Sequence, residues 1–114
     1  MHLKDLPKCP VETTLNLLNN KWKVLIIRDL MNGTMRFGEL KKTLGTITQK
    51  VLTTNLRSME EDGLVLRKEF SEIPPRVEYT LTDIGYSLAN IIDSMTDWGS
   101  GYKEYLKLLE KSKK

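Results

Sequence analysis

Residues 37–63 read FGELKKTLGTITQKVLTTNLRSMEEDG, and this stretch decides the fold. Its first part places apolar side chains three and four positions apart, which predicts a short helix from about Phe37 to Leu44 that Gly45 closes. Thr48 is a residue type that caps helices, and it precedes a longer helical segment, Gln49–Glu61. The stretch therefore predicts two helices joined by a tight turn at residues 45–47.

The second of these helices has two chemically different faces. Leu52, Leu56 and Met59 fall within about 60° of one another at about 100° per residue, so they form the buried face. The opposite face is polar and carries Lys50, Thr53, Thr54, Arg57 and Glu61. Such a face is either simply solvated or contacts a partner.

The hydrophobic period changes after Gly63. Residues 64–70 and 77–81 alternate as two strands do, and two prolines lie in the loop between them. Proline cannot donate to a strand ladder, so the two prolines belong in the loop. The segment is therefore predicted to be a β-hairpin with a stiff tip, and this tip carries Arg76.

Helices are also predicted on both sides of this unit. They are expected at about Pro10–Leu18, where proline suits the first helical position, and at about Lys21–Met31. A last helical stretch starts at Thr82, and its apolar stripe comprises Ile84, Leu88, Ile91, Met95, Trp98, Tyr102, Tyr105 and Leu109. Gly99 and Gly101 interrupt it, and since each costs a helix about 1 kcal/mol relative to alanine, we expect a bend or break there.

The composition suits one soluble domain over residues 1–114. Apolar residues make up 39% of the chain and charged residues 29%, which excludes a disordered protein. The longest aliphatic run, Val24–Ile27, is far shorter than the about 20 residues that span a membrane. Without a membrane span or an apolar leader, a cytoplasmic location is expected.

Residue types that support catalysis or metal binding are scarce. The chain has one cysteine, Cys9, and one histidine, His2, so neither an internal disulfide nor a Cys/His zinc site can form. A Ser-His-Asp triad would depend on His2, and the glycine-containing segment 33–38 lacks the lysine that a phosphate loop requires. We therefore expect no enzyme, no metal and no cofactor.

Charge is unevenly distributed along the chain. Residues 1–57 carry 10 Lys/Arg and 4 Asp/Glu, whereas residues 58–102 carry 3 and 9. This distribution has two interpretations. The basic half can form a face that binds a polyanion, or the charges can serve solubility alone.

Short helix, turn, helix and hairpin follow one another as in a winged helix-turn-helix, a mostly α fold with a small β-hairpin. The second helix of such a motif enters the major groove of double-stranded DNA. The DNA-binding residues predicted on this basis are Thr48, Gln49, Lys50, Thr53, Thr54, Arg57 and Arg76. Gln49 suits adenine, whereas Lys50 and Arg57 suit guanine or phosphate. The acidic end at residues 60–62 must then point away from the duplex.

Several short motifs resemble those of HxlR-type winged helix-turn-helix regulators, within the MarR-like superfamily. In chain order they are CPVE (9–12), NKWK (20–23), RFGEL (36–40), ITQKVLT (47–53), EEDGLV (60–65) and PPRVEYTLT (74–82). The resemblance implies a bacterial homodimer that binds a palindromic operator through its recognition helix and wing, and we expect a repressor. One departure is Asn19-Asn20, where the family often has two glycines.

The resemblance also implies that the N- and C-terminal helices form the dimer interface. The apolar stripe supports this, because it is longer than a small domain needs, although its first half is expected to pack partly on the Trp22 helix. The predicted interface residues are Val11, Leu15, Leu88, Ile91, Met95, Trp98, Tyr102, Tyr105 and Leu109.

Cys9 directly precedes the first predicted helix, where free backbone N–H groups stabilise an anion such as a thiolate. Some HxlR-type regulators with a cysteine at the matching position resemble thiol sensors, which extends this role to Cys9. The alternative is an inert, small apolar residue beside the interface. As the chain has no second cysteine, any disulfide would be intermolecular.

A hypothesis of a different class is a winged-helix module that contacts only proteins. Its docking face would be the acidic stretch 58–102.

Overall fold

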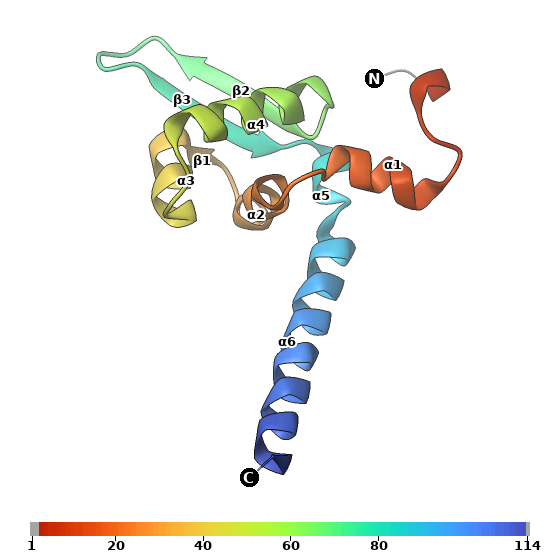
Figure 1. Cartoon of the computed structure of the whole chain (residues 1–114). Helices are drawn as coiled ribbons and strands as arrows, with labels where there is room; N and C mark the ends of the chain where they lie inside the picture. Colours follow the sequence, from red (N-terminus) through yellow and green to blue (C-terminus); the bar gives the residue numbers. More distant parts are fainter. Residues whose placement is uncertain (1–2, 114) are drawn as a thin grey trace.

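The computed structural model describes residues 3–113, so His2 lies outside the described residues. The chain forms a small helical body with a β-sheet wing, and a long C-terminal helix projects from it (Figure 1). In order the elements are η1 (Leu3–Asp5), α1 (Pro10–Leu17), α2 (Lys21–Leu30), β1 (Met35–Arg36), α3 (Phe37–Leu44), α4 (Gln49–Glu61), β2 (Val65–Phe70), β3 (Arg76–Leu81), α5 (Asp83–Tyr86) and α6 (Ala89–Ser112). The expected winged helix-turn-helix is confirmed.

The sheet has one strand more than the sequence predicts. Its strands lie in the order β1-β3-β2, and both neighbouring pairs are antiparallel. The additional strand, β1, contributes only Met35 and Arg36, which pair with Tyr79 and Glu78 of β3. Two residues are too few to display the alternation by which a strand is recognised in a sequence.

The core lies where α2, α3 and α4 meet the sheet. The fully buried side chains come from all four of these parts and are Ile26, Ile27, Leu30, Leu40, Leu52, Leu56, Met59 and Val65. The predicted inner face of α4 is thereby confirmed. Because one face of α4 is anchored in this core, the opposite polar face is held outward in a fixed direction.

Both ends of α4 are closed by residues whose chemistry suits the position. The Thr48 hydroxyl accepts a hydrogen bond from the backbone N–H of Val51 at 3.1 Å, which confirms the predicted cap. At the other end Gly63 adopts a φ of +79°, and the backbone N–H of Leu64 donates to the Met59 carbonyl at 2.9 Å. This reversal ends the helix and sends the chain directly into β2.

The prediction of a bend at Gly99 and Gly101 is wrong, because α6 continues as a helix through both glycines. Each glycine costs the helix about 1 kcal/mol relative to alanine. This cost is too small to break a helix of 24 residues that continues on both sides of the two glycines. The chain breaks earlier instead, at Ser87 and Leu88 between α5 and α6.

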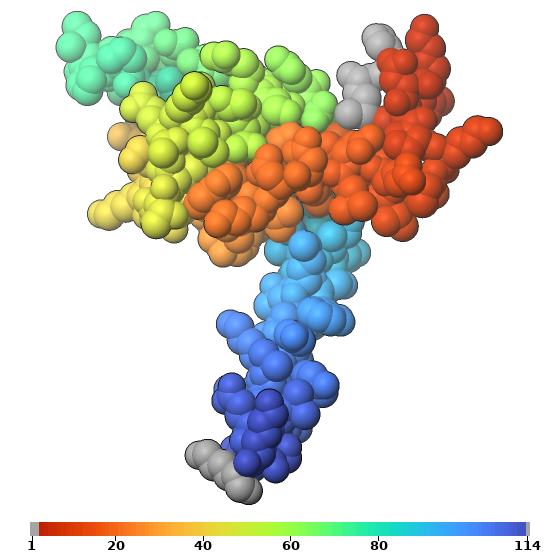
Figure 2. Space-filling view, viewed as in Figure 1, coloured from red at the N-terminus to blue at the C-terminus, as the bar shows by residue number. Residues whose placement is uncertain are grey.

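Most of α6 lies outside the body. Residues 93–112, which we call the stalk, are exposed apart from the half-buried Gly99, and Figure 2 shows them projecting clear of the other elements. The helix reaches the core only near its start, through Ile92, and the partly buried Leu88 just before it also packs there. No helix in residues 3–113 is long and apolar enough to cross a membrane.

Candidate nucleic-acid interface

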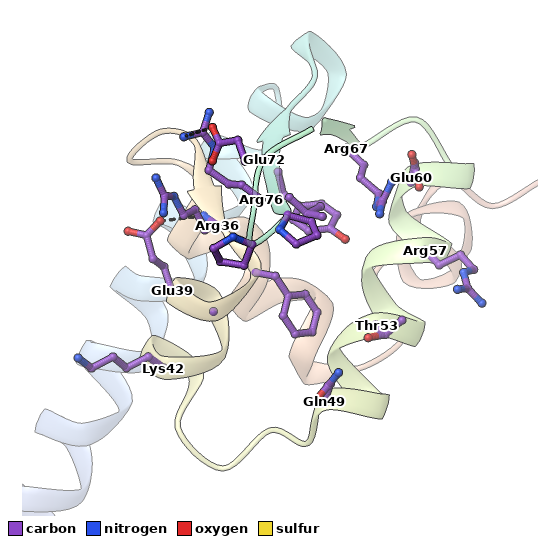
Figure 3. A pocket seen from close by; sticks show the side chains of 16 residues that line it. Arg36, Glu39, Lys42, Gln49, Thr53, Arg57, Glu60, Arg67, Glu72 and Arg76 are labelled. Atoms are coloured by element: carbon purple, nitrogen blue, oxygen red, sulfur yellow. Dashed lines mark hydrogen bonds and ion pairs between the residues drawn. The ribbon is translucent and has the colours of Figure 1, made fainter. Parts of the chain in front are cut away.

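A cleft separates α4 from the wing, which is the hairpin of β2 and β3 (Figure 3). Its lining combines α3, α4 and the wing and consists of Arg36, Phe37, Gly38, Glu39, Lys42, Gln49, Thr53, Arg57, Glu60, Arg67, Glu72, Pro74, Pro75, Arg76, Val77 and Tyr79. Five of these side chains are cationic and three are acidic, so the cleft carries a net charge of +2. One of the acids is Glu60, so the expectation that the whole acidic end of α4 points away from this face is wrong for that residue.

The α4 wall holds three of the residues predicted from the sequence. Gln49, Thr53 and Arg57 follow one another along the helix at intervals of four residues and border the cleft (Figure 3). Lys50 and Thr54 are exposed on the same helix but do not line the cleft. The structure thus brings the predicted residues of α4 together on one accessible face.

Arg76 lies at the opposite side of the cleft, and its surroundings differ from the expectation. It is the first residue of β3 rather than part of the tip. Its guanidinium is 3.3 Å from both Glu72 and Glu78, and its Cζ lies 3.9 Å from the centre of the Phe70 ring. Arg76 is therefore held against the wing by two carboxylates and an aromatic ring.

Arg67 is a cleft residue that sequence reasoning missed. It extends from β2 toward α4 (Figure 3), its side chain is 39% exposed, and its ion pair with Glu69 is long, at 3.5 Å. Tyr79, which faces it across the strand pair, raises the pKa of the guanidinium through a hydrogen bond, and Glu69 adds to this. The sequence does contain a signal for this position. Side chains two residues apart lie on the same face of a strand, so Arg67 shares the face of the buried Val65.

Two further cations of the cleft, Arg36 and Lys42, were also missed. Arg36 precedes α3, and its backbone N–H donates to the Glu39 carboxylate at 2.9 Å, which ties that acid to the helix start. The lining also includes apolar side chains, among them Phe37 and Val77. A cleft lined by an excess of cations and by apolar side chains suits a sugar-phosphate strand, which presents both anionic and apolar groups.

The residues predicted for a dimer interface are uncovered in the single chain, with one exception. Val11 and Leu15 of α1 are 66% and 59% exposed, and Trp98 of the stalk is 72% exposed. The exposed side chains on α6 also include Ile91, Met95, Tyr102, Tyr105 and Leu109. The exception is Leu88, which packs against the core. We expected such a partial contact for the first half of the apolar stripe.

Three aromatic rings form a continuous stack along the stalk. The ring centres of Trp98 and Tyr102 are 5.4 Å apart, and those of Tyr102 and Tyr105 are 6.0 Å apart. Because the stack is exposed to water, it gives the stalk a large apolar face that no other described element covers.

Cys9 is exposed and occupies the N-cap position of α1, as the sequence predicts. Its side chain makes no capping hydrogen bond. The thiol is thus open to reagents at the start of a helix whose own apolar side chains are exposed.

Known proteins share both the sequence and this architecture. A family model described as HxlR-like helix-turn-helix matches residues 17–107. A relative from Bacillus subtilis (strain 168), an uncharacterized HTH-type transcriptional regulator named YdeP, is 43% identical over 110 residues, which cover 96% of this chain and 86% of the relative.

Two solved structures are similar as well. A MarR-family transcriptional regulator of Porphyromonas gingivalis W83 has a TM-score of 0.79 at 36% identity, with 82% of this chain and 91% of that chain covered. The redox regulator HypR in its reduced form has a TM-score of 0.81 at 38% identity, with 87% and 98% covered. The chain therefore belongs to the HxlR-like helix-turn-helix family of transcriptional regulators.

Proposed function

We propose that the protein acts as a homodimeric repressor that binds a palindromic DNA operator. The observation that carries this proposal is the polar face of α4, which is exposed except at the half-buried Thr53 and is bordered by the cleft with its excess of cations. With α4 in the major groove and the wing toward the neighbouring minor groove, the sugar-phosphate strand that separates these grooves runs through the cleft.

The polar face of α4 and the wing have separate roles in this arrangement. Gln49, Lys50 and Arg57, together with the two threonines of the same face, meet base edges or nearby phosphates. The start of α4 at Thr48 adds free backbone N–H groups, which suit a phosphate oxygen. Arg67 and Arg76 contact the backbone from the wing.

The second copy covers the exposed faces of α1 and α6. A stack of three aromatic rings on a projecting helix is a costly surface to leave in water, and a second stalk offers a matching apolar face. Such a two-fold dimer would place two recognition helices about 34–36 Å apart, which is one turn of DNA.

Oxidation of Cys9 is the control that we propose for this dimer. HypR, a structural neighbour, is described as a redox regulator, and Cys9 is exposed on the helix that we assign to the interface. One peroxide molecule would convert two Cys9 thiols into one disulfide and be reduced to two water molecules. A link between the two α1 helices would then shift the spacing of the recognition helices and release the DNA.

The deciding experiment selects binding duplexes from a random-sequence DNA pool with the purified protein. A two-fold symmetric sequence should be enriched, and the complex should contain two chains. Enrichment of no sequence, together with capture of a defined protein through residues 58–102, would instead favour the interaction module.

A further inference from the structure

Two polar contacts join the start of α2 to the inner side of α4. The Asn20 amide donates to the Asn55 side-chain oxygen at 2.9 Å, and the Lys23 ammonium donates to the Ser58 hydroxyl at 2.9 Å. We call these two contacts the α2–α4 bridge. They are one helical turn apart on both helices, because positions 20 and 23 face positions 55 and 58.

The bridge is partly buried, because Asn55 and Lys23 are buried whereas Asn20 is exposed and Ser58 half-buried. Both asparagines are also hydrogen-bonded within the helices that carry them. Asn55 is 7% exposed and donates to the Val51 carbonyl at 2.9 Å, within α4. The Asn20 side chain accepts from the backbone N–H of Lys23 at 3.2 Å, which caps α2. Lys23 itself is 4% exposed.

Such a contact fixes position more sharply than apolar packing does. If α4 turned or slid against α2, the Asn55 oxygen and the Lys23 ammonium would stay buried without their partners, which is costly. The leucines of the same interface could slide at a much lower cost. The bridge therefore specifies one orientation of α4.

We propose that Asn55 is a positioning residue for DNA recognition, which acts through Asn20 and does not touch DNA. It lies on the recognition helix but faces inward, and it sets the angle at which Gln49 and Arg57 meet the groove. This inference rests on the proposed DNA binding.

The bridge also lies close to α1 along the chain. Asn20 follows the end of α1 at Leu17 by three residues. The bridge therefore lies next, along the chain, to the helix that we propose for the dimer interface.

The test uses substitutions that remove the bridge and keep the helices. Asn20→Ser retains an oxygen that caps α2 but removes the amide that reaches Asn55. Asn55→Leu keeps a side chain of similar size on α4. Thr43→Val is the matched control, because the Thr43 hydroxyl donates to Asp29 at 2.9 Å and so ties α3 to α2 without touching α4.

Affinities are measured for the duplex that the wild-type protein enriches from a random pool and for a scrambled duplex of the same length. Each variant is assayed where circular dichroism shows it fully folded. Asn20→Ser and Asn55→Leu should each lower the ratio of the two affinities by about 3- to 10-fold, the worth of one net hydrogen bond. The salt slopes of these two variants should match that of the wild-type protein. For Thr43→Val, both the ratio of affinities and the salt slope should match the wild-type values.

Three results would overturn the inference in distinguishable ways. If both folded variants keep the wild-type ratio of the two affinities, the bridge only stabilises the fold and does not position α4 for recognition. An equal fall in affinity for both duplexes, with their ratio unchanged, would make Asn55 or Asn20 a contact to the DNA backbone. If the wild-type protein enriches no sequence, the proposed function fails and the positioning role fails with it.

Discussion

Removal of Arg67 tests whether a DNA strand lies in the cleft. Arg67 extends toward α4, and besides its contact with Tyr79 it has one long ion pair, with Glu69 at 3.5 Å, so its guanidinium can still reach a phosphate. Arg67→Ala should weaken binding to all duplexes and flatten the dependence of affinity on salt.

The size of this effect follows from counterion release. One phosphate contact contributes a slope of about 0.9 in a plot of log affinity against log salt, so a dimer that loses two contacts loses about 1.8 units. Over the fourfold rise from about 50 to 200 mM salt, that difference amounts to about tenfold in affinity. The wild-type protein should therefore lose about ten times more affinity over this range than Arg67→Ala does.

Fluorescence anisotropy with a labelled duplex at four or more salt concentrations gives the slope directly. Lys103→Ala is the control, because Lys103 is an exposed cation on the stalk, far from the cleft. Arg76→Ala should change the slope less than Arg67→Ala does, since Arg76 shares its charge with Glu72 and Glu78. An unaltered slope in Arg67→Ala would refute the placement of a backbone strand against β2.

Other predictions concern assembly, stability and oxidation. Trp98→Glu should convert a dimer into a 13.2 kDa particle in light scattering, whereas Ser100→Glu, on the other side of the helix, should not; a dimer in both variants would move the interface elsewhere. Gly63→Ala should lower the free energy of unfolding in urea by about 1 kcal/mol or more, because φ is +79° there, while Gly101→Ala within α6 should not lower it. Diamide should release wild-type protein from its duplex but leave Cys9→Ser bound, and equal release of both would exclude Cys9 as the sensor.

The helix-turn-helix unit could be predicted closely from the sequence, because its signals are local. The bounds predicted for α3 and α4 agree with the structure, since Gly45, Thr48 and Gly63 mark the ends of these helices by their own chemistry. The buried face of α4 followed from its period alone.

The features that were missed depend on contacts between distant residues. Asn20 and Asn55 are 35 positions apart, and neither has a local pattern that predicts the other. β1 forms only because β3 offers it a partner, and Arg76 is held by Phe70 and two acids that the folded wing brings together. The DNA role of each cleft residue stays a prediction for the same reason, since it depends on a partner that the chain does not contain.

The proposed pairing through the uncovered stalk would also make this regulator sensitive to its own abundance. Pairing through an exposed helix is a second-order event, so below the dissociation constant of the pair a twofold fall in chain concentration removes about three-quarters of the pairs. Occupancy of a site that needs both copies then falls more steeply than the amount of protein does. Synthesis, dilution by cell growth and proteolysis would thus set a threshold for control of the target genes, independently of any signal that the protein receives.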